Sequence, residues 1–374
     1  MQILKVFAYF LLAYVGPKSY SGTIMYPRGV HMTNLHVTLQ KIIPEGILDL
    51  ERRYEILKTV LYSAPIGRRA LADHLNLSER IVRAEVDFLR QNAFLKVTSS
   101  GMEITSEGYT LVQDLEDLMY EIKGLTELEK KVSKILNINK VIIVPGNSDE
   151  NDMFKKDIGK AAARLLLSMI RPGNTIAITG GSTVNQMVKA IQPLGSTYDD
   201  VFVLPARGSV GHRVEYQSNT LASELAQKLG AKYKLLNIPD HLSKKSLESI
   251  IKEPEIQDTL EKVSKADILI FGIGNALKMA EKRGLSETIL DFLRRKEAVA
   301  EAFGYYFDPS GNIVYTSRSV GIKLDDIKKI PYMIAVAGGT SKAQAIKAAG
   351  HLLKHGCVVM DEGAANEIIR CAKL

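Results

Sequence analysis

Three short helical patterns of apolar positions occupy the first part of the chain. Over residues 47–62 apolar side chains recur at helical spacing beside charged ones, which predicts a helix that Pro65 and Gly67 end. Two shorter patterns follow, separated by a turn at Asn76-Leu77, and Ser78 is a residue type that caps helix N-termini. Two short helices joined by a tight turn are typical of a helix-turn-helix. Their apolar positions are Ala70, Leu71 and Leu75 in the first helix, and Ile81, Val82, Val86 and Leu89 in the second.

The pattern then changes from helical to strand-like. Apolar positions at 95–97 and 102–104 flank Ser99-Ser100-Gly101, a run of turn-forming residues, and predict a β-hairpin. We interpret the helices and the hairpin as a winged helix-turn-helix, which together with a linker helix forms an expected domain over residues 32–123.

A long helical pattern covers residues 105–136. Its leading apolar positions are spaced 4, 3, 4 and 3 residues apart, a short heptad stripe that either pairs two copies of the chain or packs on its own domain. Gly124 breaks the pattern, and Thr126 with Glu129 has the sequence of a capping box that restarts the helix. The stripe consists of Leu111, Leu115, Leu118, Ile122 and Leu125.

Strand and helix patterns alternate from Val141 onward. This alternation indicates an α/β domain over residues 124–374, with a mainly parallel, doubly wound Rossmann-like sheet and helices on both faces. A helix is expected over residues 157–170, between the first two strands. In such open sheets ligands bind beyond the carboxyl ends of the strands. The strand candidates begin at residues 141, 176, 201, 234, 268, 312, 333 and 357.

Two of these strands end in a pair of glycines followed by hydroxyl residues and a helical pattern. The first turn is Gly180-Gly181-Ser182-Thr183, and the second is Gly338-Gly339-Thr340-Ser341-Lys342. Backbone N–H groups at the start of a helix bind anions such as phosphate. One such turn is equally well explained as a tight turn of the fold, but two predict a ligand with two phosphates, or one phosphate and another anionic group.

Other strand ends carry side chains that suit a phosphorylated sugar. Arg207 follows one strand, and an arginine grips phosphate oxygens with two parallel hydrogen bonds. Gln217 and Asn219 offer the neutral hydrogen bonds that sugar hydroxyls need. Cations follow another strand: Lys278 and Lys282 are best explained as solvated side chains, and Arg283 is also explained as a cation at a helix C-terminus.

The charge of the chain permits a nucleic-acid partner without requiring one. The formal net charge is +7, but the first 31 residues contribute three cations and no acid. Cations outnumber acids between residues 52 and 96, so the predicted winged helix is locally basic, which favours DNA binding. The alternatives are the solvated face of a small helical bundle and a surface for protein contacts. We expect Ser78, Glu79, Arg80 and Arg83 to face a DNA major groove, and Arg68, Arg69, Arg90 and Lys96 to hold phosphates.

Residues 1–31 show no folded-domain pattern. They begin like a secretory signal, but their apolar part is shorter than the about 20 residues that span a bilayer, and no clear cleavage site follows. We therefore expect a mis-assigned start or a disordered leader, with Met32 as the true start and no membrane association. Cys357 and Cys371 lack metal or redox spacing, and the histidines lack ligand spacing, so we predict a cytoplasmic protein without a metal site.

The winged helix and the motifs that follow it together resemble the SorC family of bacterial transcription regulators. These motifs are TGGST, PARG, FGIG, EAFGYYFD, VAGGTSKAQAI and DEGAA. The resemblance extends from residue 32 to the C-terminus. It implies a sugar-phosphate-sensing domain akin to sugar-phosphate isomerases, a role as a DNA-binding repressor of glycolytic genes, and fructose 1,6-bisphosphate as the effector, with no further cofactor.

The resemblance also implies roles for individual residues. One phosphate would bind the first glycine turn together with Lys342 and the Gly338-Gly339 turn, and the remaining residues would hold the sugar and the other phosphate. Ser182 stands where a threonine is more familiar in the family, which keeps the hydroxyl. The implied effector-binding residues are Gly180, Gly181, Ser182, Thr183, Arg207, Gln217, Arg283, Glu301, Gly339 and Lys342.

Two function classes follow from these observations. The main hypothesis is a repressor that forms a dimer, and a tetramer on DNA, and that a phosphorylated sugar releases from its operator. The alternative is an enzyme of the sugar-phosphate isomerase type with an attached regulatory head, in which Asp361 or Glu362 would act as the base.

Overall fold

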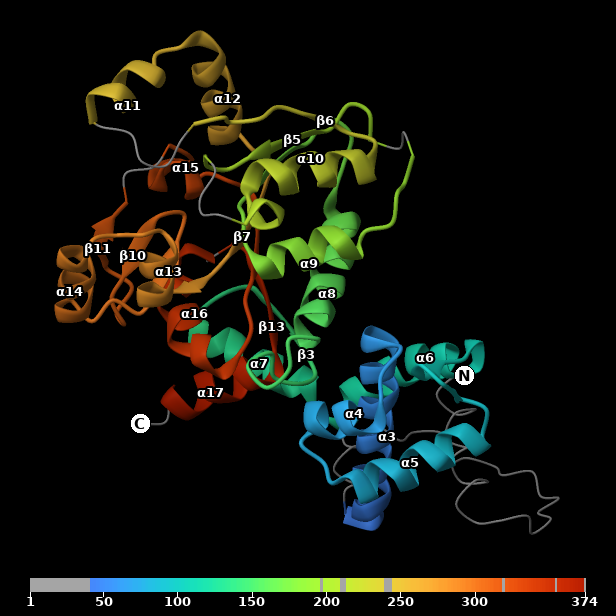
Figure 1. Cartoon of the computed structure of the whole chain (residues 1–374). Coiled ribbons are helices and arrows are strands. Elements are labelled where there is room, and N and C mark those ends of the chain that lie inside the picture. The colour runs from blue at the N-terminus through green and yellow to red at the C-terminus, as the bar shows by residue number, and fades with distance from the viewer. Residues whose placement is uncertain are drawn as a thin grey trace, which may run out of the picture. The chain divides into compact units, whose positions relative to one another are not determined.

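The chain divides into two compact units, Met1–Thr126 and Glu127–Leu374 (Figure 1). The computed structural model describes residues 41–195, 198–208, 213–238, 244–317, 320–353 and 355–372. The expectations for the leader and for Met32 therefore lie outside the described residues. The division falls in the first turn of a helix that begins directly after Gly124.

The first unit is a winged helix-turn-helix, as predicted. Its apolar core draws on all the helices described in this unit and on the hairpin, including Leu57, Leu71, Val86 and Met102. Asn76 ends one helix of the motif in the left-handed conformation, and the Ser78 side chain accepts from the Ile81 N–H, as expected of an N-cap. The elements are α3 (Pro44–Ser63), α4 (Arg68–Leu75), α5 (Glu79–Gln91), β1 (Leu95–Thr98), β2 (Gly101–Ile104) and α6 (Ser106–Ile122).

Two residues assigned to the apolar faces of this motif are exposed instead. Ile81 is 38% exposed, while Val82, Val86 and Leu89 are buried. The buried positions alone have the four- and three-residue spacing of one helix face, so Ile81 lies off that stripe. Ala70 is also exposed, one residue before the buried Leu71.

The leucine stripe of α6 packs within its own unit. Leu115, Leu118 and Ile122 are buried in the core of the first unit, which we call the head. This agrees with the interpretation that the stripe packs on its own domain. The predicted capping box is wrong, because α7 (Leu125–Leu136) begins before Thr126. The Glu129 carboxylate instead accepts from the Ile143 N–H at 2.7 Å.

A seven-stranded parallel sheet forms the centre of the second unit, as predicted. Its order is β3-β13-β12-β7-β4-β5-β6, so the direction of winding reverses between β4 and β7. The crevice at such a reversal is where ligands bind in open α/β sheets. The strands are β3 (Lys140–Val144), β4 (Thr175–Ile178), β5 (Phe202–Pro205), β6 (Lys232–Tyr233), β7 (Ile268–Gly272), β12 (Tyr332–Val336) and β13 (Cys357–Asp361).

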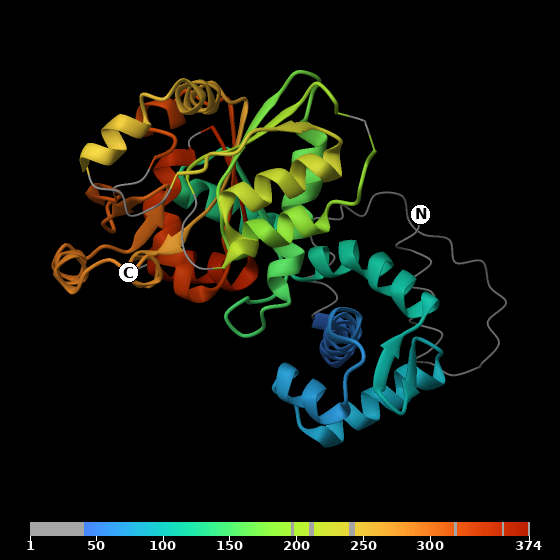
Figure 2. The same cartoon turned by 45° about the horizontal axis from the view of Figure 1, so that its top comes forward.

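Helices cover both faces of this sheet (Figures 1 and 2). Helices α8 (Phe154–Met169), α9 (Ser182–Ala190) and α10 (Ser218–Leu229) pack together on one face over an aliphatic core. On the other face lie α12 (Pro254–Ser264) against β4 and β5, and α17 (Glu362–Ala372) against β3 and β13. The remaining helices are α11 (Lys244–Ile250), α13 (Ala276–Lys282), α14 (Glu287–Arg295), α15 (Leu324–Ile327) and α16 (Ala343–Ala349). Short 3₁₀ helices in the described ranges are η2 (Val214–Tyr216), η3 (Thr340–Lys342) and η4 (Gly350–Leu353).

The strand expected to begin at residue 234 is replaced by a different contact. Only Lys232 and Tyr233 pair with β5. The Asn219 side chain then accepts from the Leu236 N–H at 2.9 Å and donates to the Leu236 carbonyl at 3.2 Å. The side-chain amide of Asn219 thus bonds to the N–H and C=O groups of Leu236, which in a longer strand would pair with the neighbouring strand. Asn219 therefore has a structural task, and its suggested contact with a sugar stays a prediction.

A second, four-stranded antiparallel sheet was largely missed by the sequence pattern. Its order is β11-β10-β9-β8, and only β11 (Ile313–Thr316) was expected as a separate strand. The others are β8 (Gly274–Asn275), β9 (Ala300–Ala302) and β10 (Tyr305–Phe307). β9 and β10 are joined at Phe303-Gly304, where both residues have positive φ (56° and 88°). A two-residue loop of this kind matches the twist of a hairpin.

Candidate functional site

The first glycine turn leaves the start of α9 open. Gly181 has φ +134°, and a Cβ on Gly180 would lie 2.3 Å from the Tyr216 carbonyl oxygen, so the backbone path requires both glycines. The first helical hydrogen bond runs from the Asn185 N–H to the Gly181 carbonyl. The N–H groups of Ser182 and Thr183 therefore have no partner within α9, and they lie at the carboxyl edge of the sheet, where an anion is favourable.

The second glycine turn has the same sequence pattern but its N–H groups are already bonded. The Gly339 N–H donates to Asp361 at 2.8 and 3.0 Å, and the Thr340 N–H donates to Asn147 at 3.3 Å. The Ser341 N–H donates to an oxygen of Asp149 at 2.6 Å. The two turns are thus alike in sequence and different in what their donors contact.

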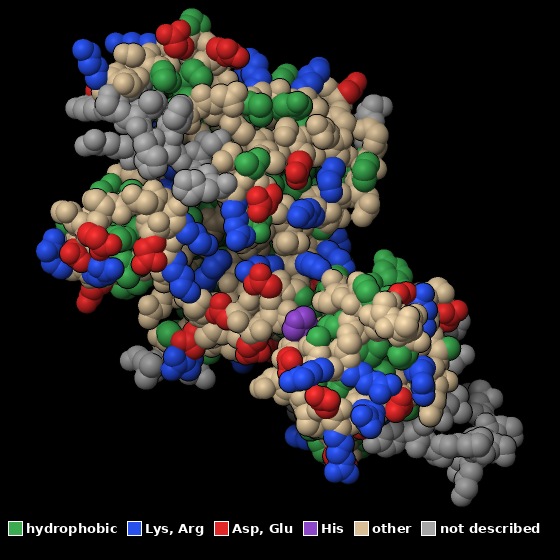
Figure 3. All heavy atoms as spheres, viewed as in Figure 1, with side chains coloured by type: hydrophobic (Ala, Val, Ile, Leu, Met, Phe, Trp, Pro, Cys, Tyr) green, Lys and Arg blue, Asp and Glu red, His purple; other side chains and the backbone are tan. Residues whose placement is uncertain are grey.

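Lys342 ends this second turn inside a cluster of cations. Its side chain is half-buried, and burial lowers its pKa to about 8, with the nearby charges of Lys155 and Lys282 lowering it further and those of Asp149 and Asp361 opposing the shift. Figure 3 shows Lys and Arg side chains gathered beside a hollow of the second unit, between α13 and α9. An anion that bound here would stabilise the charged lysine.

If Lys342 binds an anion, the affinity should fall as the pH rises from 7.5 to 9. The reason is that a group with a pKa of about 8 loses its proton over this interval, whereas a phosphate monoester is already dianionic. We expect a loss of affinity of up to about tenfold by pH 9, measured by calorimetric titration with fructose 1,6-bisphosphate.

The control for this titration is Lys342→Arg, which keeps its charge throughout the interval. An equal loss of affinity in this variant would contradict the assignment to Lys342.

The same rise in pH should increase the stability of the fold, because the unfolded lysine, with a pKa of 10.5, holds its proton to higher pH than the folded one. The buried charge therefore costs stability below pH 8, and the cost falls as the pH rises from about 8 to 10.5.

A second cationic position is built from two arginines on one carboxylate. Glu301, in β9, accepts from Arg283 at 2.5 Å, and the Arg207 guanidinium lies 3.6 Å from the same oxygen. The three side chains are at most 9% exposed. Arg207 follows β5 and is held by a bridge to Gly321, while Arg283 follows α13 and also donates to Ser317 at 3.2 Å. Two buried guanidinium groups and one carboxylate carry a net positive charge.

The hairpin turn between β9 and β10 fixes the position of Glu301. It brings the Gly304 N–H to 2.6 Å from the carboxylate oxygen that also receives Arg283. Tyr306 is paired with Glu301 across β9 and β10. Burial raises the pKa of Tyr306 to about 12, and its hydroxyl has no hydrogen-bond partner among the described residues. We had not singled out Tyr306, although its segment, EAFGYYFD, was among the family-like motifs.

The remaining candidates have different surroundings. Gln217 is the half-buried N-cap residue of α10, next to the first glycine turn, because the neighbouring Tyr216 carbonyl accepts from the Gly181 N–H at 2.9 Å. Asp361 is fully buried and accepts from the N–H groups of Ser148, Gly339 and Ala364. A carboxylate whose oxygens are bonded to backbone donors holds segments together and is poorly placed to act as a base.

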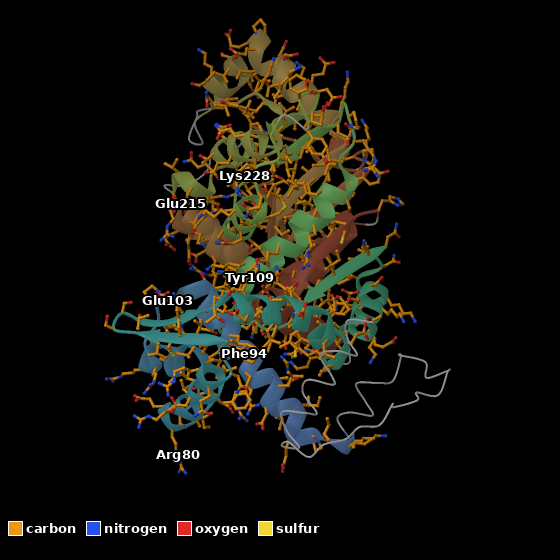
Figure 4. The ribbon with its side chains drawn as sticks, turned by 90° about the vertical axis from the view of Figure 1, so that its right-hand side faces the viewer. Arg80, Phe94, Glu103, Tyr109, Glu215 and Lys228 are labelled. Carbon is orange, nitrogen blue, oxygen red and sulfur yellow. The ribbon has the colours of Figure 1, made fainter. Side chains whose placement is uncertain are left out.

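The exposed face of α5 carries the residues expected to contact DNA. Ser78, Glu79, Arg80 and Arg83 are all exposed, and Figure 4 shows Arg80 pointing outward from the helix. At the start of α4, Arg69 is exposed and Arg68 is half-buried. None of these four arginines forms an ion pair with another residue of the described ranges. Two apolar side chains that we had not assigned to this face, Ile81 and Ala84, are exposed on the same helix.

Other basic residues of the head are paired with acids. Arg52 and Arg53 each lie 2.8 Å from the largely buried Glu85, and they join α3 to α5. Arg90 is 3.5 Å from Asp87 and Lys96 is 2.7 Å from Glu103. The basic side chains of the head that can contact DNA phosphates without first leaving an acid are therefore mainly Arg68, Arg69, Arg80 and Arg83.

Neither a metal cluster nor a membrane span is found in the part of the chain that the structure describes. No group of three or more His, Cys, Asp or Glu side chains there could hold a metal ion. None of the helices in the described ranges combines the length and apolar character that crossing a bilayer requires.

Two protein families match the chain. The family of CggR N-terminal DNA-binding domains matches residues 50–119, which include the helix-turn-helix and the wing. The family of sugar-binding domains matches residues 120–370, which include both sheets of the second unit.

Curated relatives match most of the chain. The central glycolytic genes regulator of Bacillus subtilis (strain 168) is 40% identical over 339 residues, which are 91% of this chain and 99% of the relative. The protein of the same name from Priestia megaterium is 39% identical over 340 residues, with coverage of 91% and 99%.

Solved structures of regulators share the fold. A SorC family transcriptional regulator from Enterococcus faecalis matches with a TM-score of 0.61 and 36% identity, over 65% of this chain and 99% of that one. The full-length sorbitol operon regulator SorC from Klebsiella pneumoniae has a TM-score of 0.59 over 85% of this chain and 98% of its own. At 17% identity the second match shows the fold alone.

Proposed function

The chain belongs to the SorC family of transcriptional regulators, and we propose that it represses central glycolytic genes until fructose 1,6-bisphosphate releases it from operator DNA. The observation that carries this proposal is the pair of cationic positions at the carboxyl edge of the sheet. One is Lys342, which ends the second glycine turn, and the other is the Arg207-Glu301-Arg283 cluster. A ligand with two phosphates suits two such positions.

We assign one phosphate to each position. The first phosphate would accept hydrogen bonds from the N–H groups of Ser182 and Thr183 at the start of α9, and it would form an ion pair with Lys342. The second would bind Arg207 and Arg283, whose planar groups donate two parallel hydrogen bonds to phosphate oxygens. Glu301 and Gln217 would contact the sugar hydroxyls between them.

We assign DNA reading to the exposed face of α5. Arg80 and Arg83 can donate to guanine edges or to phosphates in the major groove, and the exposed Ile81 suits the methyl group of thymine. Arg68 and Arg69 would hold the phosphate backbone. Operators of such motifs are read by symmetric protein pairs, so we further propose a homodimer in the cytoplasm that forms a tetramer on DNA.

Release from DNA requires that the effector bind one arrangement of the protein better than the DNA-competent one. Only such a difference in affinity shifts the equilibrium. A tenfold weaker complex with DNA corresponds to about 1.4 kcal/mol of coupling free energy.

The direct test is fluorescence anisotropy with labelled promoter DNA from glycolytic operons. A salt-sensitive complex that fructose 1,6-bisphosphate weakens is expected, whereas fructose should have no effect. An absence of DNA binding even at low salt would refute the repressor role. Binding that ignores every sugar phosphate tested would refute the proposed effector alone.

Two substitutions should separate the functions of the two units. Arg83→Ala should weaken operator binding by about 10- to 100-fold and leave effector affinity unchanged, because it removes one DNA contact. Lys342→Ala should weaken effector binding and leave operator affinity unchanged. Anisotropy and calorimetry on each variant measure the two effects, and Arg370→Ala, an exposed arginine paired with Glu367, serves as the control. Equal effects of both variants in both assays would contradict the division of labour.

The enzyme alternative is not favoured. The matched relatives and solved structures are transcriptional regulators. Asp361, one of the two residues considered as a base, has both carboxylate oxygens bonded to backbone N–H groups.

A further inference from the structure

The turn at Thr340–Lys342 is occupied by a loop of the same chain. We call residues 145–152, which join β3 to α8, the acidic loop. Asp149 of this loop accepts from the Ser341 N–H at 2.6 Å and from the Ser341 hydroxyl at 3.0 Å. Asn147 accepts from the Thr340 N–H at 3.3 Å and donates to the Thr340 hydroxyl at 3.0 Å. The acidic loop thus covers the donors that follow the two glycines.

The geometry of Asp149 is that of a bound anion. Both of its carboxylate oxygens receive hydrogen bonds from one residue at the start of a helical turn, as the oxygens of a phosphate do in anion-binding turns. The carboxylate lies so close over the turn that a Cβ on Gly339 would be 2.5 Å from it. The second glycine therefore makes room for an acid of this chain.

The Asp149 carboxylate lies among cations that partly balance its charge. Asp149 is among the groups that favour the charged form of Lys342, while Lys155 and Lys282 oppose it. Lys155 is itself 2.6 Å from Asp152, a second acid of the acidic loop. The loop therefore offsets part of the positive charge that a phosphate would otherwise meet.

We propose that Asp149 is an internal competitor of the effector, which occupies the Thr340–Lys342 turn when no effector is bound and leaves it when a phosphate binds at Lys342. This inference rests on the proposed function, because it concerns the same phosphate position. A dianionic phosphate at Lys342 and the Asp149 carboxylate repel each other, since both are anions whose charges act on the same lysine. Asp149 thus raises the effector concentration that the sensor requires.

The structure also indicates how Asp149 leaves. The neighbouring Ser148 N–H donates to the buried Asp361 at 2.8 Å, which fixes the backbone of the acidic loop at that residue. Asp149 itself is exposed. Its side chain can therefore rotate into solvent while the loop stays attached to the sheet.

The test is calorimetric titration of the full chain and its Asp149→Asn and Asp149→Ala variants with fructose 1,6-bisphosphate, and separately with inorganic phosphate. Asp149→Asn keeps an oxygen that can accept from Ser341 and removes only the charge. We expect both variants to bind both anions more tightly, by about tenfold for the bisphosphate. The matched control is Asp325→Asn, which removes a carboxylate that is 86% exposed on α15 and should change neither affinity.

The outcomes distinguish this inference from the proposed function. If the unaltered chain binds the bisphosphate and the Asp149 variants bind it equally or more weakly, Asp149 is no competitor, and the effector assignment still stands. If the unaltered chain binds neither anion, the proposed effector fails and the inference with it. Far-UV circular dichroism of Asp149→Asn checks the fold, and the proposal requires a tighter complex in a folded variant.

Discussion

Glu301→Ala should lower the free energy of unfolding of the second unit by about 3–5 kcal/mol, because it leaves two buried guanidinium groups without their shared carboxylate. Arg207 and Arg283 both lie against one oxygen of Glu301, and all three side chains are at most 9% exposed. The Gly304 N–H would lose its acceptor as well. Urea unfolding of the purified variant, followed by circular dichroism, measures the loss.

The control for this substitution is Glu287→Ala, which removes a carboxylate that is 81% exposed on α14. It should change the unfolding free energy by less than about 0.5 kcal/mol. An equally small effect of Glu301→Ala would mean that the arginines find other partners. Excess inorganic phosphate should restore part of the stability of Glu301→Ala, because an anion between the two arginines would replace the lost charge.

Asp361→Ala should be similarly costly for a different reason. The buried carboxylate accepts from the N–H groups of Ser148, Gly339 and Ala364, and each buried donor left without an acceptor costs about 1–3 kcal/mol. We therefore expect a loss of at least about 3 kcal/mol in unfolding free energy, measured by the same urea titration.

Asp361→Asn separates hydrogen bonding from simple packing. It retains one acceptor oxygen but directs an amide group at the remaining donors, so its stability should lie between those of the unaltered chain and Asp361→Ala. Asp200→Ala, an exposed acid before β5, is the control. Full stability of Asp361→Ala would show that the three donors are satisfied in another way.

Strong periodic patterns predicted the architecture well. The helix-turn-helix and six strands of the parallel sheet follow from apolar spacing, because each element has one face or both buried in a large core. The strands β8, β9 and β10 have only two or three residues each, which is too short for a period to be visible. The role suggested for Glu301 therefore came from the family resemblance and not from its own pattern.

The surroundings of the two glycine turns could not be predicted from their sequences. Both read as strand, two glycines, hydroxyl residues and helix, so we expected both turns to bind an anion. The difference lies in Asn147 and Asp149, and Asn147 stands 193 residues from its partner Thr340 along the chain. Pairings over such distances depend on the strand order, which places β3 next to β13 and β13 next to β12. Likewise, the pairing of Arg283 with Glu301 depends on a sheet that the pattern did not reveal.

The position of β13 in the sheet has a consequence for the synthesis of the protein. β13 (Cys357–Asp361) is the last strand along the chain, yet it lies between β12 and β3, and in the described sheet it is the neighbour that pairs with β3. The edge strand β3 therefore cannot join the sheet until nearly the whole chain has been made. The head, complete by residue 126, has no such dependence. During translation the DNA-binding unit can thus fold well before the sugar-binding unit, and a chain that stops before β13 would carry a folded first unit and an incomplete second one.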